Sequence, residues 1–246
     1  MTRILLAGES WISQSTHFKG FDSFTSVVFE RGADAFIAAA ARTGIEVEQL
    51  YAHDVPERFP DTVEELAGYD AVLLSDIGAN SFLLPPATWV GGRSRPNRLE
   101  VIGEYVRAGG GLMMAGGYLS FQGFQARANF ARTPLADLLP VQLLDCDDRV
   151  ECPQGVRPVA ADAGLLASAI QGAPDLLGYN RVLARPQAQV HASVGQDVLI
   201  ATMAVGAGRS LVWTSDIGPH WCPTPFLEWD GFAPLVDAML RWGAAA

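Results

Sequence analysis

The sequence predicts an α/β domain with a doubly wound, mostly parallel β-sheet, and three observations support this expectation. Short apolar runs suited to buried strands alternate with longer runs suited to helices, as in βαβ units whose sheet is covered on both faces. Gly109-Gly110-Gly111 separates one such helical run from the next apolar strand. In the C-terminal half, two apolar runs flank Gly206-Ala207-Gly208, which predicts a hairpin and hence an antiparallel extension of the sheet. We expect residues 1–246 to form a single domain.

In the first half of the chain, apolar runs of four or five residues predict buried strands, and alanine-rich or amphipathic runs predict helices. The expected strands are residues 3–7, 46–51, 71–74 and 112–115, and the expected helices are residues 33–42, 62–67 and 97–108. The segments from Glu9 to Gly32 and from Ser75 to Pro96 are expected to form long loops. The first of these is interpreted as a functional loop or an excursion from the domain.

The second half is predicted to contain short strands or sheet edges and a closing helix. The expected strands are residues 141–144, 157–160, 181–184, 197–204 and 210–214, and the expected helix is residues 232–242. The sequence Ser-Asp-Ile-Gly occurs twice, at residues 75–78 and 215–218, each time after an apolar strand. Both copies are therefore expected at the carboxyl end of a strand, where open α/β sheets bind their ligands.

Composition excludes several classes of protein. Hydrophobic residues make up 49% of the chain and charged residues 18%, so a large core is expected and disorder is not. The formal net charge of -10 disfavours nucleic acid and anionic membranes as partners. The sequence contains no signal-peptide pattern and no apolar run long enough to span a bilayer. Its odd number of cysteines (Cys146, Cys152 and Cys222) predicts reduced thiols, and we expect a cytoplasmic location.

The run from Gly109 to Phe121 has the layout of a nucleophile elbow: a glycine turn, a buried strand and a tight glycine-rich turn. We expect a helix after this turn, whose backbone N–H groups would point at an anion or an oxyanion. A plain strand-to-helix turn, in which the glycines only permit close packing, would have the same sequence. Both interpretations therefore stay open.

Three segments together resemble the class I glutamine amidotransferase-like family. They are GGGLMMAGGYLSFQG (109–123), TPLADLLPV (133–141) and DVLIATMAVGAGRSLVWTSDIGPHW (197–221). The resemblance covers most of the chain, points to the branch of uncharacterised bacterial cytoplasmic proteins and implies a flavodoxin-like fold. The ThuA-like trehalose-utilisation group is a more distant relative.

Class I amidotransferases have the elbow sequence G-x-C-x-G, and this chain departs from it. Tyr118 or Gly117 stands at the nucleophile position, depending on the register, and neither is a cysteine. Without a thiolate at the elbow, the resemblance does not extend to glutaminase activity by the family mechanism.

The resemblance places His220 near the position of the general base, and Asp216 is close enough in sequence to orient it. The alternative for His220 is a buried histidine bonded to the backbone of a proline-bounded loop. Ser120 is the hydroxyl nearest the elbow and could serve as a nucleophile, although serine is equally typical of a helix N-cap. We expect Tyr118 or Ser120 to contact the reacting group.

A further set of residues at the strand ends and in the elbow is expected to bind substrate. They are Glu9, Ser10, Asp76, Asn80, Gly117, Gln122 and Trp221. Asp76 has the alternative of a turn in which its side chain bonds its own backbone. No phosphate loop or dinucleotide motif is present, so we expect no nucleotide cofactor.

Three functions are compatible with these residues. The first is a hydrolase acting on a small polar metabolite, with His220 as the base. The second is a non-catalytic small-molecule-binding protein or an oligomeric scaffold. The third is a metal-dependent hydrolase, which would require Glu9, Asp76, Asp216 and His220 to converge on a divalent ion, although their spacing gives no local support for a metal site. Trp- and Phe-rich segments expected on the surface predict a homo-oligomer.

Overall fold

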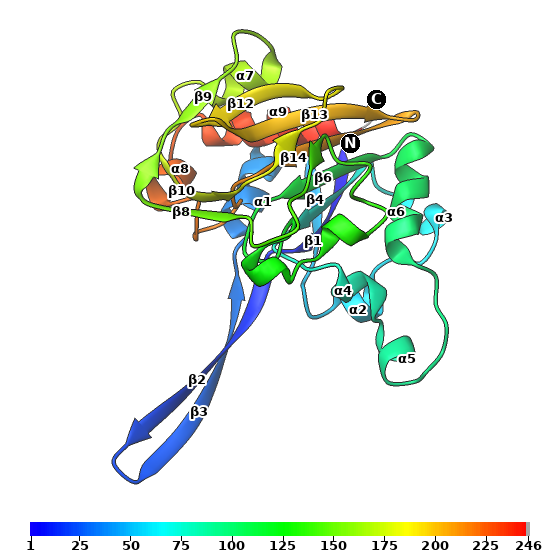
Figure 1. The fold of residues 1–246 in the computed structure, drawn as a ribbon, viewed down its shortest axis with the longest axis vertical. Helices are drawn as coiled ribbons and strands as arrows, with labels where there is room; N and C mark the ends of the chain where they lie inside the picture. The colour runs from blue at the N-terminus through cyan, green and yellow to red at the C-terminus, as the bar shows by residue number, and fades with distance from the viewer. Residues whose placement is uncertain (245–246) are drawn as a thin grey trace.

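The computed structural model describes residues 1–244 and is built around one eight-stranded sheet (Figure 1). In spatial order its strands are β4 (Glu46–Leu50), β1 (Arg3–Gly8), β5 (Ala71–Ser75), β6 (Gly111–Ala115), β14 (Gly208–Trp213), β13 (Asp197–Val205), β12 (Gln189–Val194) and β9 (Pro158–Ala160). The first five strands in this order run parallel, and β13, β12 and β9 extend the sheet in antiparallel fashion. Numbered along the chain, the parallel strands have the order 2-1-3-4-5, which is the flavodoxin-like arrangement. The predicted fold class and its antiparallel extension are confirmed.

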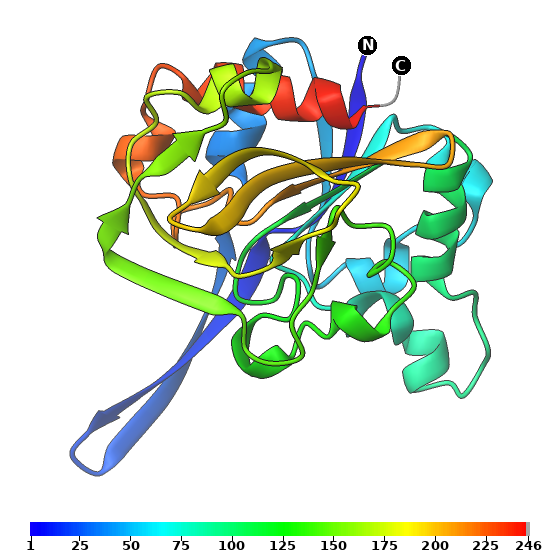
Figure 2. The same ribbon diagram turned by 45° about the horizontal axis from the view of Figure 1, so that its top comes forward.

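Helices cover both faces of the sheet, as buried parallel strands require. On one face lie α1 (Asp34–Arg42) and α9 (Phe232–Gly243), and on the other lie α6 (Arg98–Arg107) and α3 (Val63–Leu66) (Figure 2). Successive side chains of β1 point to opposite faces of the sheet and so belong to two different hydrophobic cores. Leu6 belongs to the core that contains Phe36 of α1, whereas Leu5 belongs to the core that contains Leu99 of α6.

The end of β1 is shaped by Gly8. Its φ of 104° is readily adopted only by glycine, and a Cβ there would overlap the Ser75 carbonyl oxygen at the end of β5. The two strands can therefore approach closely, and the Glu9 N–H donates to the same Ser75 oxygen at 2.8 Å. As a result, Glu9 is fixed at the carboxyl edge of the sheet.

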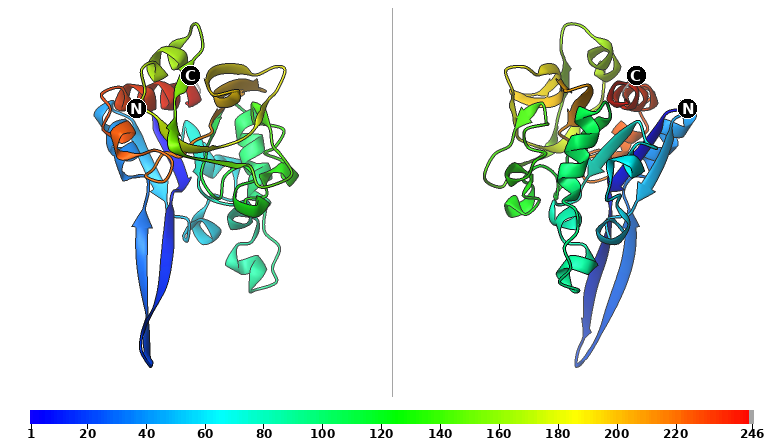
Figure 3. Two further views of the ribbon diagram at one scale, coloured as in Figure 1. Left: turned by 60° about the vertical axis from the view of Figure 1, so that its left-hand side comes forward. Right: turned by 90° about the vertical axis from the view of Figure 1, so that its right-hand side faces the viewer.

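The expected loop from Glu9 to Gly32 is instead a long β-hairpin, and that prediction was wrong. Strands β2 (Ser10–Lys19) and β3 (Asp22–Arg31) pair antiparallel along their whole length and project far from the rest of the molecule (Figures 1 and 3). Both faces of most of this hairpin are exposed. Apolar and polar residues therefore occur on both faces, and the alternation that identifies a half-buried strand is missing.

Other differences concern short elements. The expected loop from Ser75 to Pro96 contains α4 (Asn80–Leu83) and α5 (Pro86–Trp89). No helix follows the elbow: residues 116–123 form turns, and the next helical element is the short 3-10 helix Phe124–Ala126. A pair of strands outside the main sheet, β8 (Arg149–Val156) and β10 (Leu176–Asn180), was not expected. Three helices were also missed: α2 (Val55–Arg58), α7 (Leu165–Ile170) and α8 (Thr224–Leu227).

All other predicted strands and helices are present, with ends within two residues of those expected. They include the short pair β7 (Val141–Gln142) and β11 (Leu183–Ala184). Within residues 1–244, no helix is both long enough and apolar enough to cross a membrane. The three cysteines are unpaired.

The close packing at the start of β6 predicts a stability effect. A Cβ at Gly111 would overlap the Gly243 carbonyl oxygen at the end of α9 and lie 2.8 Å from the Ala71 Cβ. We expect Gly111→Ala to lower the free energy of unfolding by roughly 1–3 kcal/mol, as overpacked cores do. Urea unfolding measures this. Gly68→Ala is the control, because the nearest heavy atom to its Cβ would be 3.7 Å away. Equal stabilities of the two variants would contradict the packing argument.

Candidate functional site

Three buried or half-buried carboxylates lie at the carboxyl edge of the parallel sheet. Glu9 follows β1, Asp76 follows β5 and Asp216 lies three residues beyond the end of β14. Glu9 and Asp76 have φ values of 50° and 43°, a left-handed conformation that is uncommon for non-glycine residues. Such strained residues cluster at functional sites. The repeated Ser-Asp-Ile-Gly sequence therefore marks two of the three strand ends that form this cluster.

Glu9 is the most enclosed member of the cluster, with only 1% of the residue exposed. The Ser75 hydroxyl donates to its Oε2 at 2.6 Å, whereas its Oε1 is buried without a hydrogen-bond partner. A Cβ at Gly218 would lie 2.8 Å from Oε1, so glycine at that position leaves room for the carboxyl group. A buried oxygen without a donor is costly when the carboxyl is ionised.

Burial raises the pKa of the Glu9 carboxyl well above its usual range, and the negative charges of Asp216 and Asp76 raise it further. Burial, together with the charge of Asp216, also raises the pKa of Asp76 to about 6. Neighbouring like charges oppose simultaneous ionisation, so Glu9 and Asp76 do not titrate independently of their surroundings. The protonated form of Glu9 consequently persists to a higher pH than that of an exposed glutamate.

Asp216 connects this cluster to His220. Its Oδ1 accepts the Gly218 N–H at 3.0 Å, and its Oδ2 lies 3.7 Å from His220 Nδ1. The nearby Asp216 carboxylate raises the pKa of His220, against the opposing effect of desolvation. The imidazole is half exposed and lies between two aromatic rings, with centroid distances of 5.1 Å to Trp11 and 5.7 Å to Tyr118. A half-exposed histidine backed by a buried carboxylate is suited to proton transfer.

The backbone of the elbow does not provide free oxyanion donors. The Leu119 N–H donates to Asp76 Oδ1 at 2.6 Å, and the Tyr118 N–H also interacts with this carboxylate. The Gly117 N–H donates to Asn180 Oδ1 at 2.9 Å. The elbow amides therefore bind acceptors of the protein itself, and the predicted helix N-terminus is absent. The expectation that these amides face a ligand is not met in this structure.

Neither hydroxyl proposed at the elbow is arranged as a nucleophile. The Tyr118 hydroxyl donates to Glu151 Oε1 at 2.9 Å, and burial together with this partner raises its pKa. Ser120 is buried, and its Oγ accepts the Asp76 N–H at 3.0 Å. Ser120 is therefore not the cap of a helix. It supports the strained backbone at Asp76 instead.

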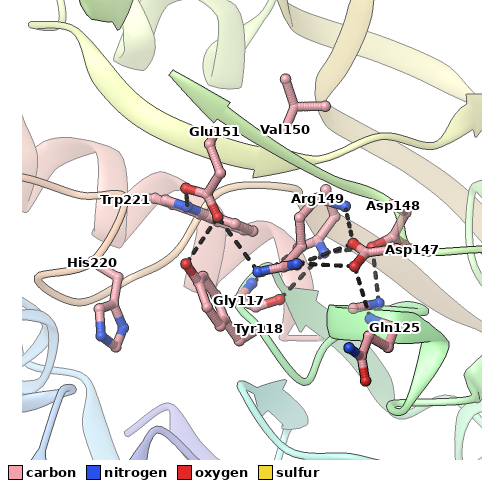
Figure 4. A network of polar contacts seen from close by, with 12 residues as sticks. Gly117, Tyr118, Gln125, Asp147, Asp148, Arg149, Val150, Glu151, His220 and Trp221 are labelled. Atoms are coloured by element: carbon pink, nitrogen blue, oxygen red, sulfur yellow. Dashed lines mark hydrogen bonds and ion pairs between the residues drawn. The ribbon is translucent and has the colours of Figure 1, made fainter. Parts of the chain in front are cut away.

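A network around Glu151 forms a wall beside His220 (Figure 4). Tyr118 donates to one carboxylate oxygen of Glu151, and Trp221 Nε1 donates to the other at 3.0 Å. The Arg149 guanidinium lies 4.6 Å from the Tyr118 ring centroid and 3.6 Å from Glu151 Oε1. Asp147 holds Arg149 through two hydrogen bonds, and this contact lowers the pKa of Asp147 to about 2. Sequence reasoning identified Tyr118 and Trp221 but missed Glu151 and Arg149, because β8 gave no strand signal.

The other predicted substrate-binding residues have structural partners or lie outside this cluster. Ser10 Oγ accepts the Ala52 N–H at 2.9 Å, and the buried Gln122 side chain accepts the Ala131 N–H at 2.9 Å. Asn80 is exposed at the start of α4. The structure gives none of these three side chains a contact with His220.

Cys222 lies close to the carboxylate cluster without being a reactive thiol. It is buried, and burial followed by the charges of Asp216 and Glu9 raises its pKa well above the usual range. The thiolate, which is the nucleophilic form, is disfavoured in such an environment. Cys222 is therefore a buried packing residue.

A metal centre has little support in the described part of the chain. Among residues 1–244, no group of three or more His, Cys, Asp or Glu side chains has an arrangement that could hold a metal ion. The carboxylates instead interact with hydroxyl and backbone donors, and with one another.

Residues 3–245 match the family model GATase1_like, whose description is "Putative glutamine amidotransferase". A search of curated proteins found no match. Among solved structures, Cytoplasmic Protein STM3548 from Salmonella typhimurium is 39% identical, with a TM-score of 0.93 and coverage of 99% of each chain. Cytoplasmic Protein STM1381 from Salmonella typhimurium LT2 is 42% identical, with a TM-score of 0.93 and coverage of 99% of this chain and 100% of that one.

A more distant structure shares the fold alone. A thua-like protein from Bacteroides uniformis has a TM-score of 0.54 at 12% identity, covering 98% of this chain and 90% of that one. The resemblance found in the elbow and the C-terminal hairpin is thereby confirmed, with the ThuA-like group as the weaker neighbour.

The enclosed carboxyl of Glu9 predicts a pH-dependent gain of stability on neutralisation. A folded-state pKa above the unfolded value makes the Glu9 contribution most favourable below the unfolded pKa, and this contribution is lost as pH rises towards the folded pKa. Glutamine keeps the shape and carries no charge. We expect Glu9→Gln to be more stable than wild type at neutral pH by on the order of 2 kcal/mol, because the neutral amide avoids the cost of ionising a buried carboxyl.

Thermal unfolding at several values between about pH 5 and pH 8 measures the difference in stability between the two proteins. This difference should grow as the pH rises. Glu104→Gln is the control, because Glu104 is an exposed residue of α6 and its neutralisation should leave the pH dependence unchanged. A Glu9→Gln variant less stable than wild type throughout this range would contradict the assignment.

Proposed function

This chain belongs to the class I glutamine amidotransferase-like family, and we propose that it is a hydrolase-type enzyme that acts on a small polar metabolite without a cysteine nucleophile. The observation that carries the proposal is the half-exposed His220, whose Nδ1 lies 3.7 Å from a carboxylate oxygen of the buried Asp216. The proposed site lies at the carboxyl edge of the sheet, where α/β proteins bind ligands.

The surroundings of the elbow favour attack by water over covalent catalysis. Tyr118 or Gly117 stands where family members have a cysteine, and Asp76 occupies elbow amides that would bind an oxyanion. In the proposed reaction, neutral His220 takes a proton from water, and the resulting hydroxide forms a bond to the substrate carbonyl carbon. The bond to the leaving amine or alcohol then breaks, and the His220 imidazolium returns the proton to that group.

The carboxylates support this proton transfer in different ways. Asp216 orients the imidazole and stabilises the imidazolium that forms, as a buried carboxylate does in other histidine-dependent hydrolases. Glu9 is a positioning residue: a proton held on Glu9 leaves the negative charge of the cluster on Asp216, beside His220. Asp76 fixes the elbow backbone through its contact with Leu119.

The side chains around His220 limit the chemical class of the substrate. Glu151, Asp76 and Asp216 make the surroundings of His220 acidic, and Trp11 and Tyr118 supply aromatic surfaces. Such a site favours a small amide or ester that carries hydroxyl or ammonium groups over an anionic substrate. A cytoplasmic metabolite is the class of substrate proposed, in keeping with the cytoplasmic relatives.

A second candidate is a small-molecule-binding protein that retains the site without catalysis. It is favoured by one observation: Asp76 is seated on the elbow amides of Tyr118 and Leu119, next to a nucleophile position without cysteine. The contact with Asp76 stabilises the elbow when no substrate is bound. The elbow itself carries no nucleophilic side chain.

The hydrolase proposal predicts a steep dependence on His220. Purified protein would be screened for hydrolysis of small amides and esters, and for thermal stabilisation by the same compounds. We expect His220→Gln to lower kcat/KM by about 10²–10⁴, the usual contribution of a general base. The wild-type rate should rise with pH through a His220 pKa above 6.5, because only the neutral imidazole accepts a proton.

His17→Gln is the matched control, since His17 is exposed on the hairpin far from the cluster and should leave turnover unchanged. Turnover by His220→Gln equal to that of wild type would refute the proposal. Compounds that stabilise wild type but are never hydrolysed would favour the binding protein.

A further inference from the structure

The β2–β3 hairpin, residues Ser10–Arg31, is the most exposed apolar feature of the molecule, and we refer to it as the arm (Figure 3). Its large apolar side chains outside the base are open to solvent on both faces. They are Ile12, Phe18, Phe21, Phe24, Val27 and Val28, of which Phe18 is 78% and Val27 64% exposed. A two-stranded hairpin alone is at best marginally stable in water, and soluble monomers seldom expose contiguous apolar surface of this extent.

Within residues 1–244, the contacts between the arm and the rest of the molecule are made at its base (Figure 3). Phe29 packs edge-on against Tyr51 and His53, with centroid distances of 5.1 Å and 5.2 Å, and Trp11 contacts His220. Beyond the base, aromatic contacts such as that of His17 with Phe24 at 4.7 Å are made within the arm itself. The outer part of the arm therefore requires a partner that the isolated chain does not provide.

Charge indicates what kind of partner this is. The arm carries Lys19 and Asp22 at its tip and Glu30 and Arg31 at its base, for a net charge of zero, whereas the whole chain has a net charge of -10. Two copies of so acidic a chain repel each other over most of their surfaces. The arm is a segment through which they can meet without repulsion, and its tip offers one charge of each sign. A membrane is a poor partner, because no cluster of basic residues flanks the apolar surface.

The area of the arm also fits self-association. Ten residues at ~3.3 Å each give a length of about 33 Å, and two strands ~4.8 Å apart make a ribbon roughly 10 Å wide. Each face therefore presents about 300 Å². Two arms contributed reciprocally by two copies bury four such faces, about 1,200 Å² of arm surface, together with a similar area on the surfaces that receive them, and the total of roughly 2,400 Å² is in the range of a stable dimer. A single arm held by an unrelated protein would bury only about half of that total, at the lower limit for a specific interface.

We propose that the arm is a dimerisation element that docks on a second copy of this chain, reciprocally across a two-fold axis. This proposal does not depend on the hydrolase function. It does have a consequence for the site, because the arm begins at Ser10, directly after Glu9, and its Trp11 packs on His220. When a second copy holds the arm, the position of Trp11 is fixed, and Trp11 is one of the two aromatic rings that contact the His220 imidazole.

The test is the mass of the full-length protein in solution, measured by sedimentation equilibrium across a wide range of concentrations. We expect wild type to be a dimer or a larger even-numbered assembly. Phe18→Ser combined with Val27→Ser should weaken self-association by about a hundredfold or more, since four anchoring side chains are lost per dimer. A second variant, in which residues 14–27 are replaced by Asn-Gly, shortens the arm while keeping a hairpin turn and should be monomeric.

Val159→Ser combined with Leu165→Ser is the matched control, because it removes two exposed apolar side chains outside the arm and should keep the wild-type mass. Circular dichroism would verify that each variant is folded. A monomeric wild type at every concentration would overturn the proposal, and so would folded arm variants that retain the wild-type mass. In the first case the arm would serve a different partner.

Discussion

The candidate site depends on one geometric constraint: parallel strands deliver the residues that follow them to the same edge of the sheet. Adjacent strands β1 and β5, together with β14, which is separated from β5 by β6, bring Glu9, Asp76 and Asp216 together although they are far apart in sequence. Three acidic groups in a buried setting cannot all be ionised without large cost. The cluster must therefore retain a proton, and the enclosed Glu9 is the residue whose surroundings favour it most.

The same constraint explains how this chain departs from cysteine-dependent amidotransferases. The elbow after β6 lies beside the end of β5, so Asp76 can reach the backbone amides of Tyr118 and Leu119. A carboxylate at those amides stabilises the turn and occupies the place of an oxyanion, while Tyr118 is directed to Glu151. Proton-transfer capacity is thus concentrated in the pair of Asp216 and His220. The amides and the hydroxyls of the elbow have become structural.

The sequence predicted what depends on local pattern and strand order. Buried strands such as Ala71–Ser75 produce continuous apolar runs, and the repeated Ser-Asp-Ile-Gly sequence located Asp76 and Asp216 at strand ends. It did not predict the arm, whose two exposed faces lack alternation, nor Glu151, which reaches the site from a strand outside the main sheet. The oxyanion site was mispredicted because the acceptor that fills it, Asp76, is brought there by tertiary structure alone.

The most direct test of this account is an NMR titration of the Glu9 side-chain carboxyl carbon in the full-length protein, with Glu9→Gln used to assign the signal. The account predicts a titration midpoint well above the ordinary glutamate value of 4.5, because the carboxyl is buried beside the negative charges of Asp216 and Asp76. The midpoint should shift downwards in Asp216→Asn, because removing a neighbouring negative charge favours ionisation. The account would be contradicted if the Glu9 carboxyl titrated at its ordinary value and its midpoint were unchanged in Asp216→Asn.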